Sequence, residues 1–273
     1  MIKIFSTIAC LLMLYAVHAQ ISRPKRNSLG ISAGWQQMKF FDQHASPLIY
    51  KATASPRLGV YYNHQTDRSI FNIKVSGGVG TANPERFGAR DYQIKWSDTS
   101  GFPYQVASQF INANIQTTYL RRLSPLNSKF STWVGGTINE SAYYADEVAN
   151  FNWFTNAVDF SPALQLNYAV NNKHNLGVKI DFASIGVLTR MVYSFFPKSN
   201  KDKNVVALFK QGTRVASINK YQKVNVVFDY KYFASNSIAL GADYQVKWFR
   251  YTYPKTIKAI DNSFNLNMEY LFH

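Results

Sequence analysis

The strongest constraint on the fold is a period-two alternation in residues 263–273. Apolar and polar side chains take turns there: Phe264, Leu266, Met268, Tyr270 and Phe272 alternate with Asn265, Asn267 and Glu269. Successive side chains of an extended chain point to opposite faces, whereas those of a helix repeat every 3.6 residues. This stretch is therefore predicted to be a β-strand with one lipophilic face and one largely polar face.

The same alternation recurs along the chain and predicts about ten strands, with eight or twelve as alternatives. The predicted strands lie within residues 28–40, 58–62, 71–79, 111–119, 129–139, 160–168, 176–182, 224–232, 238–248 and 264–272. Short turns at 63–67, 121–128, 171–174 and 235–237 alternate with longer connections at 41–55, 81–105, 140–155 and 190–223 and a loop around Pro254. An all-β, antiparallel up-and-down β-barrel has this organisation.

The first residues have the composition of an export signal. Lys3 precedes an apolar run over residues 4–17, and Ala19 precedes Gln20. We therefore predict a signal peptide over residues 1–19 that is cleaved after Ala19. The apolar run is too short to cross a bilayer as a helix.

The only cysteine, Cys10, lies inside this apolar run. A lipoprotein signal is the alternative interpretation, but the apolar core continues well past Cys10. Cleavage would leave a mature chain that can form no disulfide. We expect residues 20–27 to be a basic periplasmic lead-in and residues 28–273 to be one barrel domain.

The composition fits a membrane protein that crosses with strands. Aromatic residues make up 16% of the chain, yet the mean hydropathy is −0.21. Strands that alternate apolar and polar residues give this combination, because only one face meets lipid. After the expected signal, no stretch of eighteen apolar residues predicts a helical span. A closed barrel is the other structure that satisfies every backbone polar group in a bilayer.

With this pattern, residues 28–273 resemble the outer-membrane β-barrel proteins of Gram-negative bacteria. The resemblance implies an outer-membrane location, short turns and both chain ends in the periplasm, and long extracellular loops. It implies contacts with outer-membrane lipids and lipopolysaccharide, and a terminal strand that looks like the signal read by the barrel-assembly machinery. The usual signal ends on the aromatic residue, whereas here His273 follows Phe272. No motif selects a functional subfamily.

Aromatic girdles are expected at both membrane interfaces. The inner girdle would contain Tyr230, Tyr232, Tyr270 and Phe272, and the outer girdle would contain Trp248, Phe249 and Tyr251. The alternative fold is a secreted soluble β-sandwich or barrel, whose strands also alternate. Such a core has less need of Tyr and Trp at both ends of its apolar faces.

Charged residues that alternate with apolar neighbours are predicted to line the lumen. They are Lys74, Lys179, Asp181, Asp229, Lys231, Asp243, Lys247 and Glu269. A lysine facing lipid near the bilayer centre would cost about 2–4 kcal/mol, which favours inward placement. We expect Glu269 to be buried beside a basic partner. Because small barrels are filled by side chains, a filled lumen is favoured over an open, porin-like conduit.

The connection over residues 190–223 is rich in cations. Lys198, Lys201, Lys203, Lys210 and Arg214 are candidates for contact with lipopolysaccharide phosphates or another acidic envelope partner, and a solvated loop is the alternative. The chain has a formal net charge of +15. Nucleic acid is not an expected partner, because the charge lies on an exported scaffold without a nucleic-acid-binding motif.

Catalytic motifs are scarce. Asp42 and His44 in the first outer connection are the best available pair for activating water, as in barrel hydrolases of lipid or peptide, but no pair of aspartates accompanies them. His64 and His174 lie in predicted periplasmic turns. No spacing indicates a metal site and no phosphate loop is present, so we expect no cofactor. The sequence favours a non-catalytic envelope, interaction or narrow transport barrel, with a barrel enzyme as the alternative.

Overall fold

The computed structural model describes most of the chain beyond the expected signal peptide. The described residues are 26–95, 97, 100–106, 108–126, 128–148, 151–191 and 204–272. The expected signal peptide and residues 20–25 of the lead-in lie outside this part. The first strand already begins at Arg26, two residues earlier than the alternation predicts.

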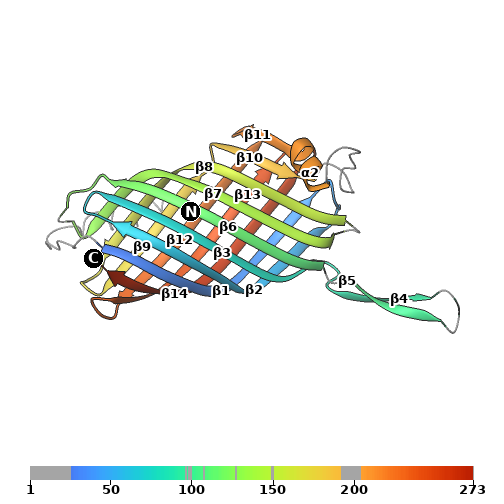
Figure 1. Ribbon diagram of the computed structural model, residues 1–273, viewed down its shortest axis with the longest axis horizontal. Helices are drawn as coiled ribbons and strands as arrows, with labels where there is room; N and C mark the ends of the chain where they lie inside the picture. Colours follow the sequence, from blue (N-terminus) through green and yellow to red (C-terminus); the bar gives the residue numbers. More distant parts are fainter. Residues whose placement is uncertain are drawn as a thin grey trace, which may run out of the picture.

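Ten antiparallel strands close into a barrel, which confirms the predicted fold class (Figure 1). They are β1 (Arg26–Asp42), β2 (Ile49–Gln65), β3 (Ser69–Pro84), β6 (Ser108–Arg122), β7 (Phe130–Val148), β8 (Phe151–Ala169), β9 (His174–Phe182), β12 (Tyr221–Phe233), β13 (Ile238–Tyr251) and β14 (Ile257–Phe272). The first and last strands close the barrel, with Ile31 opposite Met268. Closure leaves no free edge among these strands over most of the wall.

The two ends of the barrel differ. The end that carries Arg26 and Phe272, here called the inner end, has short turns between β2 and β3, β8 and β9, and β12 and β13. The opposite, outer end carries a hairpin of β4 (Arg90–Lys95) and β5 (Gly101–Val106), which projects beyond the wall in Figure 1. Among the described residues, no helix is long and apolar enough to span a bilayer.

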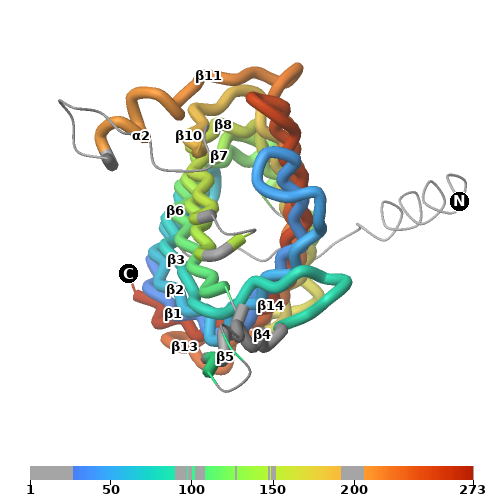
Figure 2. Tube along the Cα trace, turned by 90° about the vertical axis from the view of Figure 1, so that its right-hand side faces the viewer, coloured from blue at the N-terminus to red at the C-terminus, as the bar shows by residue number. Residues whose placement is uncertain are grey.

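A second extension branches from the wall at the outer end. The part of β8 nearer the inner end, Ala163–Ala169, pairs with β9, whereas the part nearer the outer end, Thr155–Phe160, pairs with β10 (Ile185–Arg190). In turn, β10 pairs with β11 (Thr213–Ser217). The helix α2 (Asn204–Gly212) precedes β11. Figure 2, which looks along the barrel, shows β11 and α2 outside the ring of strands. We call β10, α2 and β11 the side flap.

Two of the predicted long outer connections are shorter than expected. Residues 140–155, expected to form a loop, belong largely to β7 and β8, and the connection expected at 41–55 shrinks to residues 43–48. Tyr, Trp and Phe favour strands, and the alternation of buried and exposed side chains continues through Tyr143 and Trp153. The hairpins β1–β2 and β7–β8 therefore extend farther toward the outer end than the polar residues near their tips suggest.

Apolar side chains form the outer surface of the wall. In β14, Leu266, Met268 and Tyr270 are exposed, and in β1, Leu29 and Ile31 are exposed. Contiguous apolar surface of this extent is characteristic of a lipid-facing barrel, because water-facing walls of soluble barrels are polar. The alternation in the sequence therefore separates a lipid-facing side from an interior side.

The predicted outer girdle is wrong for two of its three members. Phe249 and Tyr251 are 5% and 1% exposed and point into the barrel. They follow Lys247 at two-residue steps, so a strand that turns Lys247 inward also turns both aromatic rings inward. Trp248 alone lies on the other face. At the inner end, Tyr270 is exposed and stacks with Phe272 at 6.2 Å between ring centroids.

Candidate functional site

The outer third of the interior is filled with aromatic rings. Phe40 stacks on Trp153 at 4.3 Å and on Tyr50 at 5.4 Å between ring centroids. Tyr143 packs against Trp153 at 6.5 Å and against Phe249 at 6.1 Å. Together with neighbouring small and aliphatic side chains, including Met38 and Ile257, these rings form one buried cluster, here called the aromatic plug. These buried rings narrow the outer part of the lumen.

Asp42 anchors the plug to the rim. Its carboxylate forms an ion pair with Arg190, at 2.6 Å between Oδ1 and the guanidinium, and its Oδ2 accepts a hydrogen bond from the indole of Trp153 at 2.9 Å. Arg190 also donates to the carbonyl oxygens of Tyr253 and Lys255. Asp42 thus joins β1 to β8, β10 and the outer connection before β14, a structural role.

His44 contacts Asp42 through its main chain. Its backbone N–H donates to Asp42 Oδ1 at 2.9 Å, and its ring Nε2 is buried without a hydrogen-bond partner among the described residues. A water-activating pair needs the imidazole to face the carboxylate and a substrate. The geometry of these two predicted residues therefore does not support the hydrolase alternative.

Beneath the plug, the interior holds a buried ion pair between Asp159 and Lys223. The two charged atoms are 2.5 Å apart, and the side chains are 0% and 3% exposed. Asp159 also accepts hydrogen bonds from Tyr221 Oη at 3.1 Å and Ser161 Oγ at 3.0 Å. Since Lys223 belongs to β12 and Asp159 to β8, this pair fastens the wall where β10 branches away.

A second buried group surrounds Asp261. Its Oδ2 accepts hydrogen bonds from Gln36 at 2.7 Å and from Tyr143 Oη at 3.1 Å. The ammonium of Lys247 donates to Tyr143 Oη at 3.2 Å and to Ser141 Oγ at 3.4 Å. Tyr143 therefore joins the aromatic plug to the charged layer below it.

Below this layer, a network around Asp243 crosses the barrel. Asp243 accepts from Asn265 at 2.7 Å and from Asn267 at 2.8 Å, and forms an ion pair with Lys74 at 3.3 Å. Arg57 donates to Asn265 Oδ1 at 3.0 Å and to Ser76. The network connects side chains from the four strands β2, β3, β13 and β14 across the interior of the barrel.

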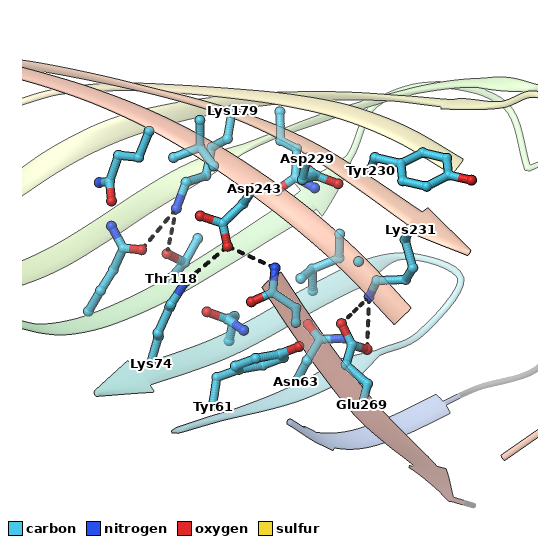
Figure 3. Close-up of a pocket in the computed structure, with 18 of the residues that line it drawn as sticks. Tyr61, Asn63, Lys74, Thr118, Lys179, Asp229, Tyr230, Lys231, Asp243 and Glu269 are labelled. Carbon is cyan, nitrogen blue, oxygen red and sulfur yellow. Dashed lines mark hydrogen bonds and ion pairs between the residues drawn. The ribbon is translucent and has the colours of Figure 1, made fainter. Parts of the chain in front are cut away.

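The inner third of the interior is open. A cavity of about 200 Å³ lies between the Asp243 network and the inner end, where Glu269 and Lys231 form an ion pair at 2.7 Å (Figure 3). It is lined by amide, hydroxyl and charged side chains from β2, β3, β6, β8, β9, β12, β13 and β14. Liquid water occupies about 30 Å³ per molecule, so the cavity has room for roughly seven waters or one small polar ligand.

The eight charged residues predicted for the lumen all lie on the interior side of the wall. Asp181, Asp243, Lys247 and Glu269 are buried, and Lys74, Lys179, Asp229 and Lys231 are partly buried. Asp181 accepts a hydrogen bond from Asn225 at 2.8 Å. Lys247 belongs to the group around Asp261, and Lys74, Lys179, Asp229, Lys231, Asp243 and Glu269 line the cavity. The eight residues are therefore spread over several layers of the interior.

The cations predicted to bind lipopolysaccharide divide into two groups. Lys198, Lys201 and Lys203 lie outside the described residues. Lys210 lies on α2 and Arg214 on β11, and both are exposed on the side flap. Arg214 lies over the ring of Tyr253 at 5.9 Å. Within the described part of the chain, no group of three or more His, Cys, Asp or Glu side chains could hold a metal ion.

Several interior residues escaped the sequence analysis. Arg57 stands one residue and Asp261 three residues before the predicted start of its strand, in phase with the inward positions that follow. Carrying the alternation farther back would have found both. The alternation assigns Arg190 and Lys223 to the two ends of an outer connection, and Asp159 lies one residue before a predicted strand. Their burial depends on the branch between β9 and β10, which no local pattern indicates.

Comparison with known proteins supports the fold and identifies no specific relative. No family model and no curated protein matches the sequence. Among solved structures, the outer membrane protease OmpT from Escherichia coli matches with a TM-score of 0.52 and 7% sequence identity, over 93% of this chain and 99% of that one.

Two further structures match less well. Ail, the attachment invasion locus protein of Yersinia pestis, has a TM-score of 0.33 at 9% identity, over 92% of this chain and 100% of that one. The Pseudomonas putida toluene transporter TodX has 0.34 at 10%, over 93% and 91%. The likeness to OmpT, at 7% identity, shows the fold alone. The chain has the fold of a ten-stranded outer-membrane β-barrel.

Proposed function

We propose that this protein is a sealed, non-catalytic outer-membrane barrel that presents its outer extensions to the cell envelope. The observation that supports this proposal is the aromatic plug. The interiors of small barrels are filled by side chains, so a ten-stranded barrel can close around such a plug and serve as a rigid scaffold without a pore. The export signal expected over residues 1–19 fits delivery to the outer membrane.

The plug and the charged layers beneath it oppose transport through the barrel. A solute entering from the outer end would have to displace stacked rings, then the buried ion pair of Asp159 with Lys223 and the hydrogen bonds that Asp261 accepts. Separating a buried ion pair leaves uncompensated charges and costs about 3–5 kcal/mol. We therefore favour a closed scaffold over the narrow transport component.

The side flap is the proposed contact with lipopolysaccharide. Its outward positions are apolar and exposed: Ile185 and Val187 on β10, Phe209 on α2 and Val215 on β11. Arg214 is exposed on the same strand as Val215. Arg214 points to the other face of β11, over the ring of Tyr253, at the edge of this apolar surface. An apolar surface with a cation at its edge suits the outer leaflet, where acyl chains meet phosphate groups that accept charge-assisted hydrogen bonds.

Planar-bilayer conductance tests the sealed barrel. The wild-type protein should be silent, whereas a Phe40→Ala, Trp153→Ala double variant should show discrete conductance steps because it removes two stacked rings of the plug. Leu58→Ala, on the exposed lipid-facing side of β2, is the matched control and should stay silent. Steady conductance of the folded wild-type barrel would overturn the proposal.

Binding of lipopolysaccharide to the purified barrel tests the side flap. Arg214→Gln should weaken binding severalfold and reduce its dependence on salt, since a screened charge contact is lost. Arg121→Gln, an exposed cation on the inner-end side of β6, serves as the control. Equal binding by the wild type and Arg214→Gln would refute this role of the flap.

A further inference from the structure

The open cavity at the inner end has a chemical character of its own. It is rich in carboxamide side chains, such as Asn63, Asn72, Asn114, Gln165 and Asn167, which can each donate and accept hydrogen bonds. It lies on the opposite side of the charged layers from the plug. Ligand binding in this cavity is therefore a question separate from the role of the outer extensions.

Most charges around the cavity are already paired. Lys74 pairs with Asp243, and Lys231 pairs with Glu269, as the dashed lines in Figure 3 show. Because the two charges of each ion pair offset each other, these four residues present little net charge to a ligand. The cavity thus differs from the uniformly basic sites that take phosphates or sulfates.

Three charged lining residues have no ion pair among the described residues: Arg57, Lys179 and Asp229. Arg57 is held by hydrogen bonds to Asn265 Oδ1 and Ser76. Lys179 and Asp229 carry opposite charges. The ammonium of Lys179 donates to Gln116 Oε1 at 3.2 Å and to Thr118 Oγ1 at 3.5 Å, and no carboxylate of the described residues lies within ion-pair distance. Asp229 makes neither a hydrogen bond nor an ion pair with any described residue. Both line the cavity, on the neighbouring strands β9 and β12.

The glycine opposite Asp229 leaves space for the Asp229 carboxylate at the cavity wall. Asp229 pairs across the strands with Gly177, and a Cβ atom on Gly177 would lie 2.2 Å from Asp229 Oδ1. A side chain at this position would displace the carboxylate. Glycine in a strand interior commonly marks such a close approach.

Other buried polar atoms at the cavity also lack partners. Arg57 is 5% exposed, yet its Nε has no hydrogen-bond partner among the described residues. The same holds for Asn267 Oδ1. Buried polar groups are normally satisfied, so unpaired donors and acceptors around an open space indicate that water or a ligand completes them.

We propose that the inner cavity binds a small zwitterion, a free amino acid or a short peptide. Its carboxylate would pair with Lys179 and its ammonium with Asp229, while the surrounding carboxamides would pair with peptide groups. A neutral sugar would leave both charges unpaired. A simple anion would face Asp229, and a simple cation would face Lys179.

Calorimetry with the full-length refolded barrel tests the proposal, with the dipeptide Ala-Ala as the probe. N-acetyl-Ala-Ala lacks the ammonium and Ala-Ala-amide lacks the carboxylate. Each should bind at least about tenfold more weakly than Ala-Ala, because one charge-assisted contact is lost. Equal binding of the capped and uncapped peptides would overturn the proposal, as would no binding of Ala-Ala at millimolar concentration.

Two variants assign the two ends of the ligand. Lys179→Gln should weaken Ala-Ala binding and abolish the preference for a free carboxylate, while Asp229→Asn should abolish the preference for a free ammonium. Lys258→Gln, an exposed residue on the outward side of β14, should leave binding unchanged. Circular dichroism checks that each variant is folded. The assigned contacts would be contradicted if a folded Lys179→Gln or Asp229→Asn barrel bound all three peptides like the wild type. The proposal would also be overturned if the barrel bound N-acetylglucosamine and not Ala-Ala, because the ligand class would then be neutral.

Discussion

The buried ion pair of Asp159 and Lys223 should be a main source of rigidity where the side flap branches from the wall. Replacing Asp159 by Asn leaves the ammonium of Lys223 buried without a carboxylate. The side chains are 0% and 3% exposed, so bulk water cannot compensate the charge. Breaking such a pair costs about 3–5 kcal/mol, and we expect Asp159→Asn to lower the free energy of unfolding by that amount.

Replacing the other partner should cost less. Lys223→Met leaves the Asp159 carboxylate with hydrogen bonds from Tyr221 and Ser161. Since these bonds to a charged group partly compensate its burial, we expect a loss of about 3 kcal/mol. The double variant removes both charges, and its loss should be smaller than the sum of the single losses by about 2 kcal/mol.

Urea unfolding of the barrel refolded in liposomes, followed by tryptophan fluorescence, measures all four free energies of this cycle. Lys258→Met is the control, because Lys258 is exposed on the outer side of β14. Single losses under about 1 kcal/mol, or a double variant whose loss equals the sum within about 0.5 kcal/mol, would refute the claim that the two charges depend on each other.

Three further tests, which use four variants, examine separate parts of the structure in the same unfolding assay. Leu266→Arg should cost about 2–4 kcal/mol if this 59% exposed residue faces lipid, whereas a loss near zero would place it in water. Gly30→Ala should destabilise the barrel by about 1–3 kcal/mol, because its Cβ would lie 2.2 Å from the ring of Tyr61; an unchanged free energy would show that the ring moves freely. Asp42→Asn should cost about 3–5 kcal/mol by leaving Arg190 unpaired, while His44→Ala should change little, and the reverse order would contradict the structural role of Asp42.

The sequence predicts the barrel well because its main signal is local. Alternation needs only neighbouring residues, and it separates Leu266 and Met268 from Asn265 and Glu269 without knowledge of any partner strand. The fold class and the strand number follow from repeating this test along the chain. The same rule, applied consistently through Lys247, would have turned Phe249 inward as well.

The interior arrangement depends on contacts that alternation does not encode. The plug joins Phe40 of β1 to Trp153 of β8, far apart in the chain, and their meeting depends on how the ten strands tilt and close. The branch of β10 from β9 is also a tertiary feature. It buries Lys223 and Arg190, which a local pattern assigns to a solvated loop.

Labelling of a single cysteine from the two sides of the membrane tests the central claim most directly. Asn167→Cys, in a Cys10→Ser background, places a thiol in the inner cavity, and Gln43→Cys places one in an exposed outer connection. With a membrane-impermeant maleimide, the account predicts that intact cells label Gln43→Cys only and that permeabilised cells label both. Labelling of Asn167→Cys in intact cells at the rate of Gln43→Cys would show an open path through the plug or a reversed orientation, and would contradict the sealed barrel.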